Sequence, residues 1–134
     1  MGHSRVVLDT SAYSRFRMGH GGLLEAMAMA DTVYLPATVL GELEAGFLLG
    51  NRYRENARML DEFLAEPFVE ALSVTPDVSR RYGRVFQQLR RAGTPIPVND
   101  IWIAASAIDC GAHLLTFDSD FGRVAELDCT IFEP

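Results

Sequence analysis

The sequence predicts an α/β fold in which a mostly parallel sheet of four to five short strands is flanked by helices on both faces. Three observations support this prediction. Short apolar runs rich in β-branched residues alternate with longer segments of helical period, the alternation continues along the whole chain, and no internal repeat or linker interrupts it. The 134 residues, 49% of them hydrophobic, fit one folded domain over residues 1–134 and exclude a disordered chain.

Five apolar segments are the predicted strands. The first is rich in valine, and the last is the weakest of the five. The predicted strands cover residues 5–8, 32–35, 69–74, 113–117 and 129–132. Because helical segments lie between most consecutive strands, we expect the strands to run parallel.

Capping and helix-breaking residues delimit the predicted helices in the first half of the chain. The Asp-Thr-Ser triplet at residues 9–11 can cap a helix after the first strand. The Gly-Gly pair at residues 21–22 separates this helix from a second one over residues 23–30. Pro36 suits the first turn of a helix that runs to about residue 49.

The following helix begins after a break at Gly50, and Asn51 is its predicted cap. Its apolar residues recur at the helical period. They are Tyr53, Ala57, Leu60 and Leu64.

Two more helices are predicted in the second half of the chain. The first begins with Thr-Pro-Asp at residues 75–77 and ends at Gly93. Its predicted core-facing residues are Val78, Tyr82, Val85, Phe86 and Leu89. The second has Asn99 as its predicted N-cap, is apolar almost all round, and ends before Gly111.

Four acidic residues, Asp9, Glu42, Asp100 and Asp118, lie where a strand ends or on a helix, each bordered by small or apolar residues. An unpaired buried charge costs several kcal/mol or shifts its pKa, so a shared divalent cation is the simplest compensating partner. Ligands of open α/β sheets bind beyond the carboxyl ends of the strands. Asp9 and Asp118 follow strands, and Glu42 and Asp100 lie on helices that can reach the same edge. The sequence therefore predicts a metal-dependent site there.

Each acid also has an ordinary structural explanation. Asp9 could be a helix cap and nothing more. Asp100 could be present simply because a negative charge stabilises the positive end of a helix dipole. Either Asp118 or Asp120 could be a turn or cap residue. Glu42 is the hardest to explain structurally, because it lies mid-helix among apolar neighbours. The shared placement of the four acids, rather than any one of them, supports a site.

The charged residues exclude several classes of phosphate-binding protein. The net charge is −6, and all 12 basic residues are arginine. A P-loop nucleotide site needs a lysine, and so do response-regulator receivers and phosphatases of the haloacid-dehalogenase type. The negative charge alone argues against a nucleic-acid partner, whereas arginine suits phosphate contacts, so charge does not decide between these possibilities.

The remaining features favour a cytoplasmic protein with reduced thiols. Cys110 and Cys129 have neither zinc-site spacing nor enough partners for a disulfide framework. No apolar run approaches the roughly 20 residues of a membrane span, and the N-terminus lacks a signal-peptide pattern. His3, His20 and His113 have no ligand-like spacing, so no role is predicted for them.

Four segments, taken in order, resemble the PIN-domain family, small metal-dependent ribonucleases that include the VapC toxins of toxin–antitoxin pairs. The segments are residues 7–11 (VLDTS), 36–43 (PATVLGEL), 99–105 (NDIWIAA) and 114–121 (LLTFDSDF). The resemblance covers essentially the whole chain, and the last two segments are the most specific. It implies a PIN-like fold and an endoribonuclease that hydrolyses RNA phosphodiester bonds.

The resemblance also implies the ligands of the site. Asp9, Glu42, Asp100 and Asp118 would bind Mg²⁺ or Mn²⁺, and Asp120 could share or assume the fourth position. Thr116, Asn99 and Thr10 would support or orient these acids. A metal-bound water would attack the phosphodiester, and we expect at least one clustered carboxyl group to have a raised pKa.

The implied partners are an RNA substrate, a cognate antitoxin protein and a second copy of the chain, with no membrane. We expect the antitoxin to lie in a groove formed by the helices between residues 36 and 64. Two alternatives stay open at this stage. They are a PIN nuclease of housekeeping RNA processing and a catalytically silent PIN-like module that only binds partners.

Overall fold

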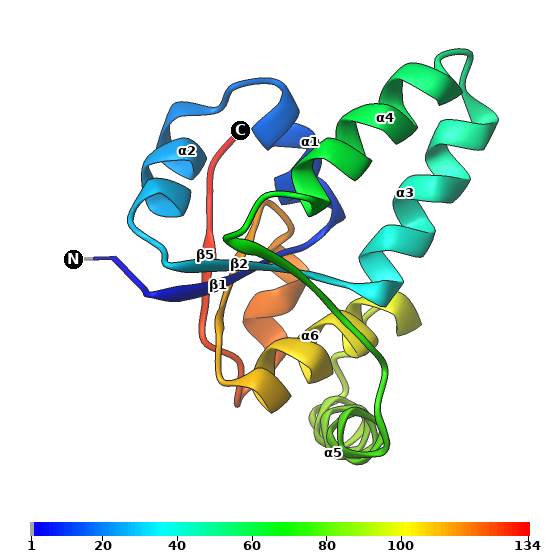
Figure 1. Ribbon diagram of the computed structural model, residues 1–134. Helices are drawn as coiled ribbons and strands as arrows, with labels where there is room; N and C mark the ends of the chain where they lie inside the picture. The colour runs from blue at the N-terminus through cyan, green and yellow to red at the C-terminus, as the bar shows by residue number, and fades with distance from the viewer. Residues whose placement is uncertain (1) are drawn as a thin grey trace.

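Five short strands form one parallel sheet at the centre of the computed structural model, which describes residues 2–134 (Figure 1). The strands are β1 (Arg5–Leu8), β2 (Thr32–Pro36), β3 (Val69–Leu72), β4 (His113–Thr116) and β5 (Cys129–Ile131). Their order in the sheet is β3-β2-β1-β4-β5, and all four of these pairings are parallel. The predicted α/β class and all five predicted strands are therefore confirmed.

Helices cover both faces of this sheet. The helices are α1 (Thr10–Arg17), α2 (Gly21–Ala28), α3 (Ala37–Leu49), α4 (Tyr53–Leu64), α5 (Pro76–Ala92) and α6 (Val98–Cys110), with a short 3-10 helix, η1 (Ser119–Arg123). In Figure 1, α1, α2 and α4 lie above the sheet, and α5 and α6 lie below it. The two layers follow from the strand order, because the chain moves from β1 to β2 to β3 in one direction and then returns across the sheet to β4.

The central strands are buried on both faces, as expected for a parallel sheet between two helical layers. Val7 of β1 pairs with Tyr34 of β2 on one side and Leu114 of β4 on the other. All four residues of β4 are buried, and Leu114 and Leu115 are at most 1% exposed. This double burial stabilises the sheet by removing apolar side chains from water.

Several predicted helix boundaries are confirmed by their caps. The Asp9 side chain accepts a hydrogen bond from the Ala12 amide and caps α1, and Thr75 caps α5 in the same way. Gly93 and Gly111 follow α5 and α6 with φ values of 70° and 66°, a left-handed conformation that glycine adopts without steric cost.

Three predicted boundaries were wrong. Asn99 is not the N-cap of α6: Pro97 holds that position, because its extended backbone precedes the first helical residue, and Asn99 lies inside the first turn. Asn51 is not the cap of α4, which begins after Arg52. Glycines 21 and 22 do not separate two helices but open α2, whose N-cap is His20.

One predicted core residue of α5 was also wrong. Phe86 is 41% exposed, whereas Val78, Val85 and Leu89 are buried. Its ring packs at 6.1 Å from Tyr82, at the margin of the α5–α6 contact rather than inside it. The helical period therefore predicted burial for a residue that lies at the edge of the buried face of α5.

Two further findings bear on the sequence-based expectations. Within residues 2–134, no helix combines the length and the apolar character that a membrane span requires. Cys110 and Cys129 are both free, half-buried thiols.

The burial of β4 predicts a large loss of stability on truncation. Leu114→Ala should lower the free energy of unfolding by about 2–5 kcal/mol, because it removes packed methyl groups and leaves a cavity. The matched control is Leu49→Ala at the end of α3, where the side chain is 90% exposed, and it should change the value by less than about 0.5 kcal/mol. Equal denaturant midpoints for the two variants would contradict the assigned core.

Candidate functional site

The candidate site lies at the carboxyl ends of β1 and β4. Leu8 and Leu115 pair at this end of the two adjacent strands, so the residues that follow them emerge side by side. The chain leaves β1 toward β2 and β3 in one half of the sheet and leaves β4 toward β5 in the other. This reversal of direction is where open α/β sheets leave a crevice for ligands.

Asp9 follows β1 directly and is only 4% exposed. Its Oδ1 accepts hydrogen bonds from the Ala12 amide and the Ser11 hydroxyl, both at 2.8 Å, and its Oδ2 accepts one from Thr116 Oγ1. Burial raises the pKa of Asp9, and the three donors oppose that rise. Asp9 is therefore both the cap of α1 and a buried acid at the site.

Two hydroxyl groups join the ends of β1 and β4. Thr116 Oγ1 donates to Asp9 and accepts from the Asp118 amide at 3.0 Å. Ser11 Oγ also donates to Asp9 and accepts from the Phe117 amide at 3.0 Å. The sequence predicted a supporting role for Thr116 but treated Ser11 only as part of a helix cap. The only signal for Ser11 was its place two residues after a strand-end aspartate.

Glu42 reaches the site from α3 and is held by two side-chain donors. Thr10 Oγ1 donates to its Oε1 at 2.5 Å, and Asn99 Nδ2 donates to its Oε2 at 3.3 Å. These bonds tie α3 to the first turns of α1 and α6. Both predicted supporting residues, Thr10 and Asn99, thus act on the same carboxylate.

Asp100, Asp118 and Asp120 form the tightest part of the cluster. One carboxylate oxygen from each lies within 4.8 Å of the other two. Asp118 Oδ1 also accepts a hydrogen bond from the Asp120 amide at 2.9 Å and so caps η1. The structure therefore brings Asp120 into the group beside Asp118, and neither displaces the other.

The electrostatics show that all five acids share one environment. The pKa of Asp100 is raised to about 7, first by burial and then by repulsion from Asp118, Glu42, Asp9 and Asp120. The predicted rise in a carboxyl pKa is therefore confirmed at Asp100 and Asp9. Removing one of these protons leaves an unfavourable concentration of negative charge, which a cation would relieve.

The donor set fits a hard divalent cation. The side-chain ligands on offer are carboxylate oxygens, which Mg²⁺ and Mn²⁺ prefer over nitrogen or sulfur. Asp100, Asp118 and Asp120 are close enough together to share one ion, while Asp9 and Glu42 add charge around them. Acids in this arrangement could bind a cation and the phosphate groups that it attracts.

Comparison with known proteins gives one family. A model of the PIN domain matches residues 6–127. Among curated proteins, ribonuclease VapC4 of Mycobacterium tuberculosis is 33% identical over 89 residues, which are 66% of this chain and 68% of that protein. Ribonuclease VapC5 of the same organism is 30% identical over 118 residues, 88% of this chain and 86% of that protein.

Solved structures show the same fold. VapBC2 from Rickettsia felis, bound to a DNA fragment from its promoter, matches with a TM-score of 0.85 and 23% identity. VapBC-5 from M. tuberculosis, a member of the VapBC family of toxin–antitoxin systems, matches with a TM-score of 0.75 and 28% identity. Each match covers 96% of this chain and 99% of the other chain.

The raised pKa of Asp100 predicts that Mg²⁺ affinity depends on pH. Below a pKa of about 7 this group is mostly protonated and must release its proton before it can bind a cation. Mg²⁺ affinity, measured by calorimetry, should therefore fall as pH drops through 7, by up to about tenfold per pH unit. Asp100→Asn should bind more weakly and lose most of this dependence. Equal Mg²⁺ affinities of the wild-type protein at about pH 6 and pH 8 would contradict the predicted pH dependence.

Proposed function

Since this chain belongs to the PIN-domain family, we propose that it is a metal-dependent endoribonuclease that hydrolyses RNA phosphodiester bonds and acts as the toxin of a toxin–antitoxin pair. The observation that carries the proposal is the convergence of five acids at one sheet edge from four separate segments of the chain. The named ribonucleases among its relatives support the same activity. We propose the cytoplasm as its place of action.

The proposed mechanism assigns a task to each group at the site. Asp100, Asp118 and Asp120 would hold Mg²⁺ or Mn²⁺, with Asp9 and Glu42 completing the negative field around it. A bound divalent cation supplies an activated water and offsets charge on the phosphate. Thr116 and Ser11 fix both oxygens of Asp9, and Thr10 and Asn99 fix both oxygens of Glu42. The carboxylates are thus held in place before substrate arrives. The proposed acids of the site are thus Asp9, Glu42, Asp100, Asp118 and Asp120, and their proposed supporting residues are Thr116, Asn99, Thr10 and Ser11.

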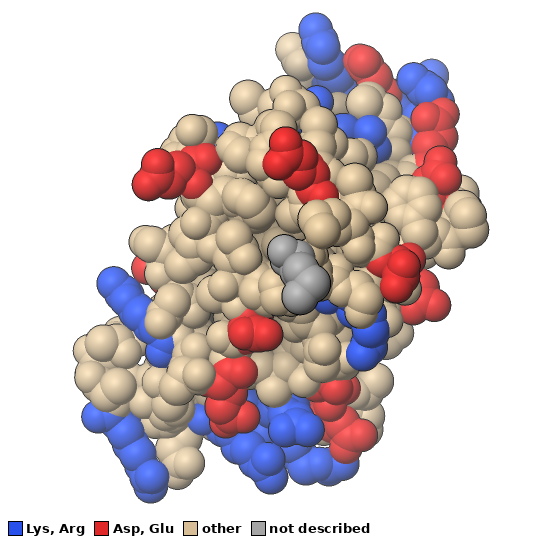
Figure 2. Space-filling model, turned by 90° about the vertical axis from the view of Figure 1, so that its left-hand side faces the viewer, with Lys and Arg blue, Asp and Glu red and all other residues tan. Residues whose placement is uncertain are grey.

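RNA phosphates need cationic contacts beside this acidic cluster. Figure 2 shows arginine side chains gathered at the lower end of one face, at the height of α5 in Figure 1. Arg80 and Arg81 of α5 form ion pairs with Asp77 and Asp109, so they are ordinary surface charges.

Arg15 and Arg123 are better placed. The Arg15 guanidinium lies 4.9 Å from the centre of the ring of Phe117, the residue before Asp118 in the sequence. Arg123 also forms an ion pair, but its partner is Asp120 of the acidic cluster itself, at 3.5 Å between Nη1 and Oδ1. We propose that these two arginines contact RNA phosphates.

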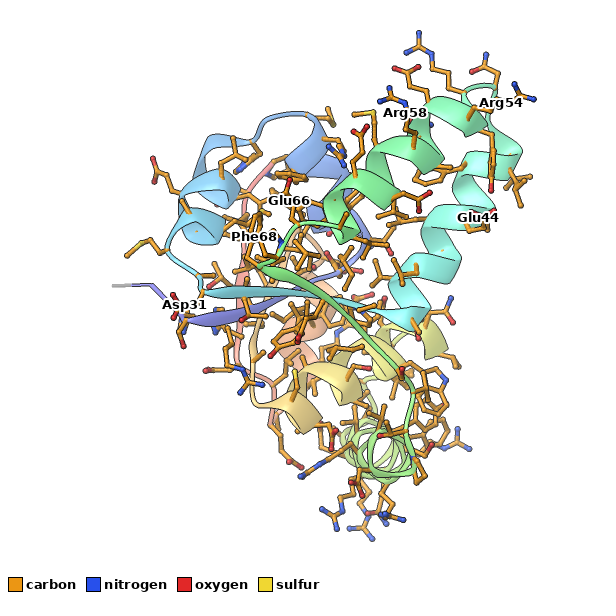
Figure 3. All side chains as sticks on the ribbon, viewed as in Figure 1. Asp31, Glu44, Arg54, Arg58, Glu66 and Phe68 are labelled. Carbon is orange, nitrogen blue, oxygen red and sulfur yellow. The ribbon has the colours of Figure 1, made fainter. Side chains whose placement is uncertain are left out.

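We propose that the antitoxin binds an apolar groove between α1, α2 and α4. The groove has a volume of about 460 Å³. Its lining residues are Phe16, Arg17, Leu24, Met27, Ala28, Met59, Glu62, Phe63, Glu66 and Phe68. In Figure 3, Glu66 and Phe68 lie beside the space between α2 and α4. Related solved structures are toxin–antitoxin complexes, which supports such a partner for this chain.

The helices between residues 36 and 64 were expected to form this groove. Of these helices, α4 lines it, together with α1 and α2. From α3, Leu43 and Phe47 line a smaller neighbouring cavity of about 210 Å³. Dimerisation stays a prediction, and Leu48 and Leu49 at the end of α3, 64% and 90% exposed, are apolar side chains available to it.

Cleavage of labelled RNA by the purified protein tests the activity. Cleavage should require Mg²⁺ or Mn²⁺ and stop with EDTA, and Asp100→Asn or Asp118→Asn should lower the rate by at least about 100-fold through loss of metal affinity. Asp31→Asn is the matched control, because Asp31 is an exposed aspartate at the opposite end of the sheet (Figure 3). Full activity in both site variants would refute the assigned centre. A protein that neither cleaves RNA nor binds Mg²⁺ by calorimetry would instead be a silent binding module.

Co-purification tests the groove. If a small antitoxin-like gene lies beside this one, its product should bind the wild-type protein and inhibit RNA cleavage. Leu24→Glu places a charge in the apolar groove and should weaken that complex at least about tenfold while leaving nuclease activity intact. Leu49→Glu, outside the groove and 90% exposed, is the control. Equal inhibition of both variants would place the antitoxin elsewhere, and the absence of such a gene would favour housekeeping RNA processing.

A further inference from the structure

A second group of metal-ligand side chains lies at the amino ends of the strands, at the opposite edge from the acidic cluster. His3 precedes β1, His113 is the first residue of β4, and Asp128 directly precedes β5. Strand pairing brings them together, since Val6 of β1 pairs with His113 and the Leu114 amide donates to the Asp128 carbonyl at 2.9 Å.

The distances within this group approach those of a metal site. One ligand atom from each of the three side chains lies within 4.8 Å of the other two. His113 Nδ1 and Asp128 Oδ2 are 3.6 Å apart, and two ligands of a tetrahedral zinc ion are about 3.3 Å apart. The three residues also line a cavity of about 290 Å³. Coordination would require the three ligand atoms to move closer together.

His113 supplies an independent observation that points to a ligand. The side chain is only 7% exposed, and its Nδ1 is buried without a hydrogen-bond partner among residues 2–134. Its other ring nitrogen, Nε2, lies 2.7 Å from Thr130 Oγ1. When Nε2–H donates to that hydroxyl, Nδ1 carries the free lone pair, and a hydrogen bond of this kind orients histidine ligands in metalloproteins. An unpartnered buried nitrogen is otherwise costly.

Asp128 does not form a hydrogen bond with this nitrogen in the observed geometry. Asp128 is 84% exposed, and its nearest oxygen, at 3.6 Å, is beyond hydrogen-bond range of Nδ1. His3 faces His113 as a stacked ring, with centroids 3.6 Å apart. A metal must lie in the plane of each imidazole ring that binds it, so His3 has to turn out of this stack. Its exposed position allows that rotation without any change in the core.

We propose that His3, His113 and Asp128 bind a transition-metal ion, with Zn²⁺ the best match to two imidazoles and one carboxylate. Imidazole nitrogen favours Zn²⁺, Co²⁺ or Ni²⁺ over Mg²⁺, which separates this site from the oxygen-only cluster at the other edge. The bound ion would fasten the segment before β1 to the starts of β4 and β5. The site does not depend on the proposed nuclease activity.

Zinc titration of the full chain by calorimetry, with excess Mg²⁺ present, tests this site. We expect a zinc-binding event that His3→Ala and Asp128→Asn each weaken at least about tenfold. Both side chains are exposed, so neither change disturbs the core. Asp31→Asn, an exposed aspartate at the same edge, should bind zinc like the wild type. Zinc held by the acidic cluster would be insensitive to all three substitutions.

Nitrogen NMR of the imidazole rings gives a second readout. Zinc should shift the Nδ1 signal of His113 and leave that of His20, at the start of α2, in place. Zinc affinity that is unchanged in either ligand variant, no zinc binding by the wild type, or an unshifted His113 signal at saturation would overturn the proposal.

Discussion

Parallel pairing of β1 with β4 is the constraint on which the rest of the molecule depends. It joins Thr116 to Asp9 across 107 positions of the sequence and places Asp118 beside them. Without this pairing, the first residues of α1 and η1 would not lie side by side. Asp100 of α6 would then not lie beside both Asp9 and Asp118. The same pairing buries apolar side chains on both faces of the sheet, which stabilises an arrangement that concentrates negative charge at one edge.

The acidic edge concentrates negative charge within a well-buried fold. Burial raises the pKa of Asp9, and repulsion from its neighbours adds to burial at Asp100. Hydroxyl donors offset part of this cost at Asp9, and an amide and a hydroxyl do so at Glu42. The remaining repulsion favours binding of a cation, so the local instability and the proposed activity have the same origin.

The sequence predicted what local chemistry determines, namely the strands, most helices, and the four acids at their ends. It erred where the partner of a side chain is distant. Asparagine often caps helices, yet the side-chain amide of Asn99 donates to Glu42 on another helix. Ser11 and Asp120 gain their places from the β1–β4 pairing. The groove depends on how α1 and α2 pack against α4, which no short pattern in the sequence specifies.

The uniform burial of β4 has a consequence for the alignment of the strand. Its two central residues are both leucine and all four positions are buried, so a slip of one residue would put one leucine in the place of the other and leave it buried. Hydrophobic patterning alone therefore penalises such a slip less than it would in a strand with one exposed face. The polar residues at the two ends of the strand, His113 and Thr116, discriminate between the two alignments, because each reaches its hydrogen-bond partner only in the observed one. Side chains that would ordinarily be considered only for binding thus also select one fold over its nearest competitor.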